Sequence, residues 1–278
     1  MSEATNRRKV AFVSGLARGQ GRTHALMLAR NGYDIVGIDV PSDMATVPYP
    51  MASGGDLSQT VKELEAAGAK VVVTEGDTRS PEDVQRAFDA GAAELDGMDV
   101  ALANAGICAY TGVLDMTFDQ WQTMIDVNLT GTFNVAQAAA RHMVKAGAGG
   151  AIILTSSSMA TKAHANLAHY VAAKFGVEGL MRSMAIELAP HKIRVNTVQP
   201  TAVNTALVQN QATYDLFCPD IENPTAADAL PRLAGLGLIG PELMEPERIT
   251  DAIEWLVSDK ARMVTGMSLK IDAGSTLK

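Results

Sequence analysis

The sequence predicts an α/β fold in which helices cover both faces of a doubly wound parallel sheet. Two observations lead to this expectation. Short aliphatic runs alternate with longer helical patterns, and each run is apolar throughout rather than at every second residue. Uninterrupted apolar runs are expected of strands that are buried on both faces. Repeated alternation of strand and helix implies right-handed crossovers, and hence parallel strands.

The expected elements follow this alternation along the chain. The strands are expected at residues 9–14, 34–39, 70–75, 99–103, 151–156, 194–198 and 268–271. The helices are expected at residues 21–31, 56–67, 81–95, 118–146, 166–189 and 246–257. Ser80 and Thr117 are typical residues to begin a helix, and Gly32, Gly68 and Gly147 to end one.

The 278 residues are expected to form a single domain (1–278), because no internal repeat, low-complexity tract or linker divides them. Two long irregular segments interrupt the alternation. An insertion at about 41–57 contains three prolines, and a segment at about 205–245 contains four prolines with one or two short helices. Both follow carboxyl ends of strands, where open α/β sheets bind ligands. We expect the second segment to be a substrate lid, while the first is either functional or disordered.

The composition limits the classes of partner. Hydrophobic residues make up 47% and aromatic residues 5%, so the core is expected to be mainly aliphatic. The formal net charge of −8 repels phosphate backbones and anionic lipid surfaces. Nucleic acid and membrane are therefore not expected as partners.

The cysteines and histidines give no sign of a metal site. Cys108 and Cys218 lie far apart, and the five histidines show no metal-ligand spacing, so neither a disulfide framework nor a metal is expected. The apolar run 10–13 is too short for a signal segment. A cytoplasmic protein is expected.

A glycine-rich segment, SGLARGQG at 14–21, joins the first expected strand to the first helix. Glycines here permit a tight turn and let backbone N–H groups at the helix start approach a pyrophosphate. Three glycines would also suit an ordinary turn. The strand before them and the helix after them favour a Rossmann-type dinucleotide site.

Asp39, at the end of the second strand, indicates which dinucleotide is bound. A carboxylate there can accept hydrogen bonds from the adenosine ribose and repels a 2′-phosphate, which favours NAD over NADP. Arg18 argues the other way, because its guanidinium could approach such a phosphate, although it could also be a solvated loop residue. We favour NAD, since Asp39 occupies the more diagnostic position.

Tyr170 and Lys174 are four residues apart and therefore share one face of an expected helix. A nearby ammonium stabilises a phenolate, so Lys174 is expected to lower the pKa of Tyr170 from about 10. A general acid/base that handles a hydroxyl or carbonyl proton needs such a shift. The same pair could occur by chance on a surface helix.

Other residues place this pair in a family pattern. Ser157 lies thirteen residues before Tyr170, the Asn-Ala-Gly motif 104–106 closes the fourth strand, and Asn128 lies in the next helix. With the glycine-rich segment, these motifs make the chain strongly resemble the short-chain dehydrogenase/reductase family along nearly its whole length.

The resemblance implies a role for each matching residue. Tyr170 would exchange the proton, Ser157 would orient the substrate oxygen, and Lys174 would hold the nicotinamide ribose. Asn128 would anchor a water-linked proton relay. The implied cofactor-binding residues are Gly15, Arg18, Gly19, Gln20, Gly21, Asp39, Asp77, Thr78, Asn104, Ala105, Gly106, Tyr170, Lys174, Pro200, Val203 and Thr205.

One motif departs from the family pattern, because the Pro-Gly expected after the sixth strand reads Pro200-Thr201. This motif and the 41–57 insertion are similar to those of mycofactocin-associated, carveol dehydrogenase-like members. That narrower resemblance implies a buried NAD that exchanges poorly, with an insertion packed over its adenosine half and reoxidation by an external carrier, mycofactocin. The family resemblance also implies a homotetramer.

The expected activity is reversible hydride transfer between NAD and a secondary alcohol, which becomes a ketone. The apolar side chains of the lid favour a hydrophobic substrate such as a cyclic terpenoid alcohol, although they could instead pack on the core. The alternative is a non-catalytic NAD-binding scaffold or sensor on the same fold. The related epimerases and dehydratases have a larger substrate domain than the residues after Val198 could form.

Overall fold

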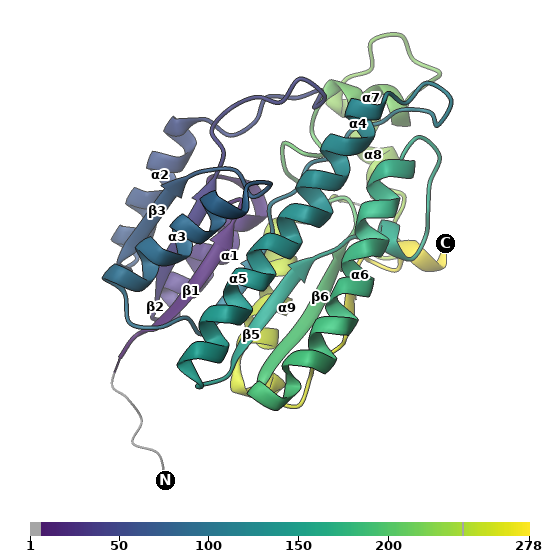
Figure 1. Ribbon diagram of the computed structural model, residues 1–278. Helices are drawn as coiled ribbons and strands as arrows, with labels where there is room; N and C mark the ends of the chain where they lie inside the picture. Colours follow the sequence, from purple (N-terminus) through teal and green to yellow (C-terminus); the bar gives the residue numbers. More distant parts are fainter. Residues whose placement is uncertain (1–6, 241) are drawn as a thin grey trace.

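The computed structural model describes residues 7–240 and 242–278 (Figure 1). Within these residues, seven strands form one sheet in the order β3-β2-β1-β4-β5-β6-β7, and every neighbouring pair is parallel. The strands are β1 (Lys9–Ser14), β2 (Tyr33–Asp39), β3 (Val71–Glu75), β4 (Val100–Ala103), β5 (Gly150–Thr155), β6 (Ile193–Pro200) and β7 (Ser268–Ile271). The doubly wound parallel sheet expected from the sequence is confirmed.

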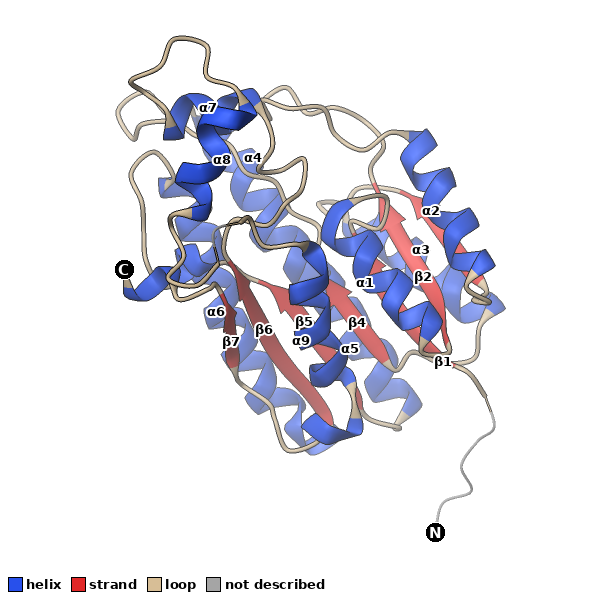
Figure 2. Cartoon of the chain, turned by 180° about the vertical axis from the view of Figure 1, so that it is seen from behind, coloured by secondary structure: helices blue, strands red, loops and turns tan. Residues whose placement is uncertain are grey.

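Helices cover both faces of this sheet, as Figures 1 and 2 show from opposite sides. The helices α3, α5 and α6 pack on one face, and α1, α2 and α9 pack on the other. The helices are α1 (Gly19–Arg30), α2 (Gly54–Ala66), α3 (Pro81–Glu94), α4 (Phe118–Ile125), α5 (Gly131–Ala146), α6 (Ala168–Leu188), α7 (Gln211–Phe217), α8 (Ala226–Ala234) and α9 (Pro246–Val257).

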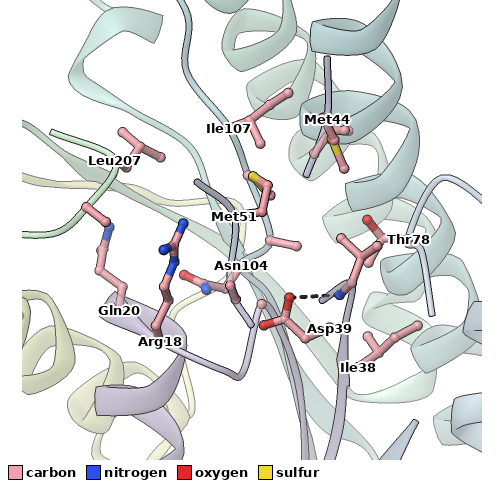
Figure 3. Close-up of a pocket in the computed structure, with 18 of the residues that line it drawn as sticks. Arg18, Gln20, Ile38, Asp39, Met44, Met51, Thr78, Asn104, Ile107 and Leu207 are labelled. Carbon is pink, nitrogen blue, oxygen red and sulfur yellow. Dashed lines mark hydrogen bonds between the residues drawn. The ribbon is translucent and has the colours of Figure 1, made fainter. Parts of the chain in front are cut away.

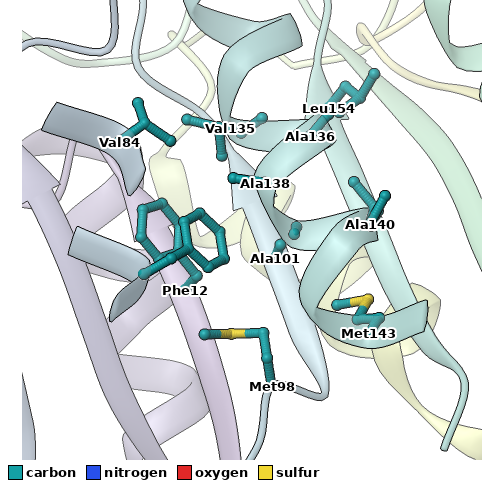
Figure 4. Close-up of a cluster of buried hydrophobic side chains, with 14 of the residues drawn as sticks. Phe12, Val84, Met98, Ala101, Val135, Ala136, Ala138, Ala140, Met143 and Leu154 are labelled. Carbon is teal, nitrogen blue, oxygen red and sulfur yellow. The ribbon is translucent and has the colours of Figure 1, made fainter. Parts of the chain in front are cut away.

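The core under α3 and α5 is aliphatic except for one aromatic pair (Figure 4). The rings of Phe12 and Phe88 stack with centroids 4.0 Å apart. Both side chains are fully buried, and burial of such a side chain contributes about 1.5–3 kcal/mol. Gly91 lets α3 approach β2 closely, because a Cβ there would lie 2.5 Å from Val36.

The strand order reverses between β1 and β4, which lie next to each other although three helices and two strands separate them in sequence. Open α/β sheets bind ligands in the crevice at such a reversal. Ser14 ties the two strand ends together, since its Oγ accepts hydrogen bonds from the N–H groups of Asn104 at 3.0 Å and Ala105 at 3.1 Å. The glycine-rich segment and the 104–106 motif therefore share one edge of the sheet.

The structure departs from the expected elements at three places. The helix expected at 118–146 is interrupted by a π-helical turn, Asp126–Thr130. The sixth strand reaches Pro200 rather than ending at residue 198. The last residues of the 41–57 insertion belong to α2, because Ser53 and Asp56 form a reciprocal cap that starts this helix at Gly54.

The π-helical turn has a local cause in Asn128. The Asn128 Nδ2 donates to the main-chain oxygen of Met124 at 3.1 Å and to that of Ile107 at 3.0 Å. A side chain that bonds the preceding turn competes with the main-chain ladder there. Asn128 is thereby fixed against the segment that follows β4.

Candidate active site

The start of α1 is shaped to receive an anionic group. Gly15 has φ +72°, and a Cβ on Gly21 would lie 1.9 Å from the Gly15 oxygen, so neither position accepts a larger residue. Arg18, which precedes α1, does not cap it with its side chain. The first N–H groups of the helix therefore remain available to a ligand phosphate. The buried Gln20 Oε1 beside them also has no hydrogen-bond partner among the described residues.

Asp39 is held in place at the end of β2. Its carboxylate accepts hydrogen bonds from the N–H groups of Ala17 at 2.7 Å and Val40 at 2.8 Å. Burial raises the pKa of Asp39, and the two N–H groups oppose that change. Figure 3 shows the Asp39 carboxylate beside the groove that Arg18 and Asn104 also line.

Arg18 is engaged elsewhere than the sequence suggested. Its guanidinium donates to the main-chain oxygen of Pro50 at 2.6 Å, within the insertion. Arg18 thereby fastens the insertion to the glycine-rich segment. It also lines the groove with Asp39, and its part in the choice between NAD and NADP stays a prediction.

Most of the expected cofactor residues lie along two adjoining hollows. The groove at the carboxyl edge of β1, β2 and β4 is lined by Gly15, Arg18, Gly19, Gln20, Asp39, Asp77, Thr78, Asn104, Ala105, Gly106 and Thr205. A cavity next to it is lined by Gln20, Asn104, Gly106, Tyr170, Lys174, Pro200, Val203 and Thr205. Gly21 lines neither hollow, because it packs under the turn at Gly15.

Asp77 and Thr78 line the groove as well. The Asp77 carboxylate pairs with Arg79 at 2.6 Å, and the Thr78 oxygen accepts from Asn134 Nδ2 at 2.9 Å. Both residues are thus held in place, Asp77 by Arg79 and Thr78 by Asn134.

The insertion forms a strap across the groove, which we define as residues 41–53. The strap's Tyr49 Oη accepts a hydrogen bond from the N–H of Cys108 at 3.1 Å. Met44 and Met51 lie on the same side of the groove as Ile107 (Figure 3), and both pack against the small apolar cluster around Ile107, as Tyr170 also does. Met44, Tyr49 and Met51 line the groove together with Asp39, and the position of the insertion over the adenosine half of a bound NAD stays a prediction.

The four expected catalytic residues line one cavity of ≈ 70 Å³. Asn128 enters from the π-helical turn, and Tyr170 and Lys174 lie one turn apart on α6. Ser157 precedes a short 3₁₀ turn (Ser158–Ala160), where its Oγ accepts from the N–H of Met159 at 3.2 Å. The fold therefore brings together residues from three separate parts of the chain.

The expected electrostatic effect of Lys174 on Tyr170 is wrong for the structure described. Burial raises the pKa of Tyr170 and lowers that of Lys174 to about 8. The Lys174 Nζ lies 5.5 Å from the centroid of the Tyr170 ring and donates to the oxygen of Thr155 at 2.9 Å. Desolvation by burial is the largest cause of both pKa changes.

The apolar residues of the lid pack mostly on one another. Val208, Cys218, Ala229 and Leu233 form a small buried core between α7 and α8. Leu238 and Ile239 are exposed. The cavity before the catalytic residues is far below the about 300–1,000 Å³ of ligand pockets, and Leu207 and Val208 of the lid line it.

The nearby thiol and imidazoles contribute no acid, base or nucleophile to the cavity. Burial raises the pKa of Cys108 to about 12, which disfavours a reactive thiolate. His169 is fully buried beside Tyr170, and His164 lines a separate hollow under the lid. Within the described ranges no group of three His, Cys, Asp or Glu side chains could hold a metal ion.

The sequence matches, over residues 15–276, the family model described as enoyl-(acyl carrier protein) reductase. It is 42% identical to (-)-trans-carveol dehydrogenase of Rhodococcus erythropolis, over 97% of this chain and 98% of that protein. The chain belongs to the short-chain dehydrogenase/reductase family.

Solved structures of other short-chain dehydrogenase/reductases agree with this assignment. Carveol dehydrogenase from Mycobacterium avium, in complex with NAD, superposes with a TM-score of 0.94 at 43% identity, covering 97% of this chain and 98% of that one. A short-chain dehydrogenase from Mycobacterium paratuberculosis bound to NAD gives a TM-score of 0.88 at 38% identity, with the same coverage. The chain is thus an oxidoreductase of this family. Among the helices that the structure describes, none is long and apolar enough to cross a membrane.

Proposed function

We propose that the protein oxidises a hydrophobic secondary alcohol to its ketone, reversibly, with NAD as the hydride acceptor. The observation that carries this proposal is the position of Asn128, Ser157, Tyr170 and Lys174 in one cavity that adjoins the Asp39 groove. A general acid/base beside a dinucleotide groove is the arrangement that alcohol oxidation needs.

The residues of the groove fit NAD. The uncapped start of α1 suits a pyrophosphate, and the unpartnered Gln20 Oε1 suits a donor on the ligand. Asp39 would accept from ribose hydroxyls and repel a 2′-phosphate. When bound, NAD would supply the carbon that accepts the hydride. The NAD complexes of two related proteins support the same choice.

The chain's own residues would handle the proton. Tyr170 would take the proton of the substrate hydroxyl, and Ser157 would hold the same oxygen in line. The raised pKa of Tyr170 means that the free phenol is protonated at neutral pH. A positively charged nicotinamide nearby would favour the phenolate, so Tyr170 is expected to become a base only in the loaded enzyme. Lys174 would bond the nicotinamide ribose, and Asn128 would anchor the water that relays the proton.

The substrate class follows from the relatives and from the walls of the site. Two relatives are carveol dehydrogenases by name, from Rhodococcus erythropolis and, at 35% identity, from Mentha piperita. The apolar side chains of Leu207 and Val208 cover the cavity. We propose a cyclic terpenoid-like alcohol as substrate, and opening of the 205–245 lid to admit it.

We also propose that NAD exchanges slowly and is reoxidised in place by an external carrier such as mycofactocin. The support is the strap, which Arg18 and Tyr49 fasten over the groove by hydrogen bonds at both sides. A covered groove slows dissociation because the strap must detach before the dinucleotide leaves.

Residues 1–278 would act as one catalytic domain within a homotetramer. The exposed rings of Phe133 on α5 and Phe175 on α6 support pairing of these helices with a second copy, since they lie on neighbouring helices of one face (Figure 1). Light scattering tests this part directly, and a monomer would contradict it.

The decisive experiment has two steps. The purified protein is denatured without added cofactor, and the nucleotide released is identified and counted. The intact protein is then assayed with (-)-trans-carveol, using either free NAD or an artificial electron acceptor. Near-stoichiometric NAD with turnover only by the acceptor supports the whole proposal. An empty protein that uses free NAD retains the dehydrogenase but removes the carrier, and bound NAD without oxidation of any alcohol favours the scaffold alternative.

A further inference from the structure

We propose that Gln199 is a positioning residue, whose side-chain amide fixes the Ser157 turn relative to the helix that carries Tyr170 and Lys174. The proposal rests on the proposed function, because it assigns a new residue to the same site. Gln199 lies near the end of β6, directly before Pro200, and is only 3% exposed.

The first link joins Gln199 to the Ser157 turn. Thr161 follows this turn and is bonded to it through its N–H, which donates to the Ser158 oxygen at 2.9 Å. The Thr161 hydroxyl donates to Gln199 Oε1 at 2.9 Å. A displacement of the turn would therefore stretch a bond to the sheet.

The second link joins Gln199 to α6. The Gln199 Nε2 donates to Glu178 Oε1 at 2.9 Å. Glu178 lies four residues after Lys174 and eight after Tyr170, so the three side chains share one face of the helix. The link thus holds the same face of α6 that presents both catalytic side chains.

The Glu178 carboxylate is itself anchored to the sheet. It is only 5% exposed, and its Oε2 accepts from the hydroxyls of Thr197 on β6, at 3.2 Å, and Ser268 on β7. In the part of the chain that the structure describes, no Lys, Arg or His lies within 4.0 Å of it. A buried carboxylate without a cation depends on its hydrogen-bond donors, so its position is well defined.

These contacts form a single chain of hydrogen bonds from the Ser157 turn to α6 through one amide. The amide can accept on one side and donate on the other only in one orientation. Ser157 and Tyr170 must approach the same substrate oxygen, and a shift of about 1 Å between catalytic groups can cost about a hundredfold in rate. This series of hydrogen bonds explains how the Ser157 turn, α6 and β6 keep one relative position.

The test changes Thr161, the exposed residue at one end of this series of hydrogen bonds, where a substitution leaves the hydrophobic core intact. Thr161→Val removes the hydroxyl that holds Gln199 Oε1, and Thr161→Ser retains it. Thr265→Val is the matched control. Thr265 is also exposed, and its hydroxyl accepts a hydrogen bond from the N–H of Val195, which lies on β6 as Gln199 does. We expect Thr161→Val to lower the single-turnover rate of hydride transfer roughly tenfold. The Kd for NAD should stay near the parent value, and the Tm should fall by a similar amount in Thr161→Val and Thr265→Val, since each leaves one buried polar group without its partner. Thr161→Ser should restore the rate, and Thr265→Val should not change it.

A second readout does not depend on finding a substrate. The protein is labelled with ¹³C at the phenol carbon of tyrosine, and the Tyr170 signal is assigned with Tyr170→Phe. We expect Thr161→Val to shift or broaden this signal and Thr265→Val to leave it unchanged. An unchanged signal, or equal rate losses in both valine variants, would overturn the role of Gln199. A parent enzyme that oxidises no alcohol would overturn the proposed function, while the spectrum still tests Gln199.

Discussion

The Tyr49 hydroxyl accepts a hydrogen bond from the Cys108 N–H at 3.1 Å, joining two segments that lie 59 residues apart in sequence. One is the strap, and the other leads away from β4 toward the catalytic cavity. The second tie, from Arg18 to Pro50, lies at the glycine-rich segment. The strap is therefore bonded to both sides of the groove that it crosses.

Tyr49→Phe is expected to release the bound dinucleotide about tenfold faster. The change leaves the buried Cys108 N–H without its acceptor, which costs about 1–3 kcal/mol in the closed form, and 1.4 kcal/mol corresponds to a factor of ten. Displacement of bound NADH, followed by its fluorescence, measures the rate. Tyr33→Phe is the control, because Tyr33 begins β2 and therefore lies at the end of that strand away from Asp39 and the groove. Equal release from both variants would show that the strap does not limit exchange.

Asp39→Asn is expected to relax the choice between NAD and NADP. The substitution removes the charge that repels a 2′-phosphate, so the affinity for NADP should rise about tenfold or more while that for NAD falls. Calorimetric titration of cofactor-free protein with each dinucleotide gives both Kd values. Asp34→Asn changes a carboxylate on the same strand that instead pairs with Arg8 at 2.9 Å, and should have no such effect. Continued rejection of NADP by Asp39→Asn would refute the role of Asp39.

Tyr170→Phe is expected to lower kcat by about 10²–10⁴-fold, since it removes the phenol that is proposed as acid/base. Bound nucleotide should remain at the parent level, because the ring still fills its place in the cluster with Met51 and Ile107. Both are measured on one preparation, by turnover of (-)-trans-carveol and by nucleotide release. Tyr214→Phe, in the lid, serves as the control. A variant at Tyr170 that keeps its activity would favour the scaffold alternative.

His24 is expected to make the folded state less stable in acid. Burial between α1 and α9 lowers its pKa to about 3, and its Nδ1 lies 2.7 Å from Thr250 Oγ1. The unfolded chain therefore takes up a proton near pH 6.5 that the folded protein does not. Stability from this group is complete above pH 6.5 and falls as the pH drops toward 3, by about 2 kcal/mol at pH 5.

Urea unfolding at pH 7.5 and pH 5 checks this expectation. His24→Gln should lose about 2 kcal/mol less than the parent protein between the two values. His191→Gln is the control, because His191 is exposed. The same pH dependence in the parent and in His24→Gln would exclude His24 as the cause.

The strands and the order of the motifs could be predicted because they depend on local signals. Buried parallel strands need runs such as 10–13 and 151–154 that are apolar on both faces. The glycines at 15, 19 and 21 are required by the backbone itself, since Gly15 and Gly19 have positive φ. A few neighbouring residues are enough to determine features of this kind.

The rest depends on contacts between distant residues. No local pattern shows that Tyr49 meets Cys108, or that Asn128 bonds Ile107 and widens the helix into a π turn. The pKa of Tyr170 was predicted to fall, whereas burial raises it, because the spacing of four residues reveals the proximity of Lys174 but not the burial of both groups. The Gln199 chain likewise joins side chains from three elements, and only the fold brings them together.

The π turn at Asp126–Thr130 joins α4 and α5 into one continuous helix and rotates the side chains of α5 about the helix axis relative to those of α4. An α-helix turns about 100° per residue, so the extra residue in a π turn offsets everything after it by about that angle. The residues before the turn pack on α6, and those after it pack mainly on α3, β4 and β5. A single-residue deletion here would restore a regular repeat, and one of these two faces would then be rotated toward water. The number of residues in this helix is thus constrained as tightly as the identity of Asn128.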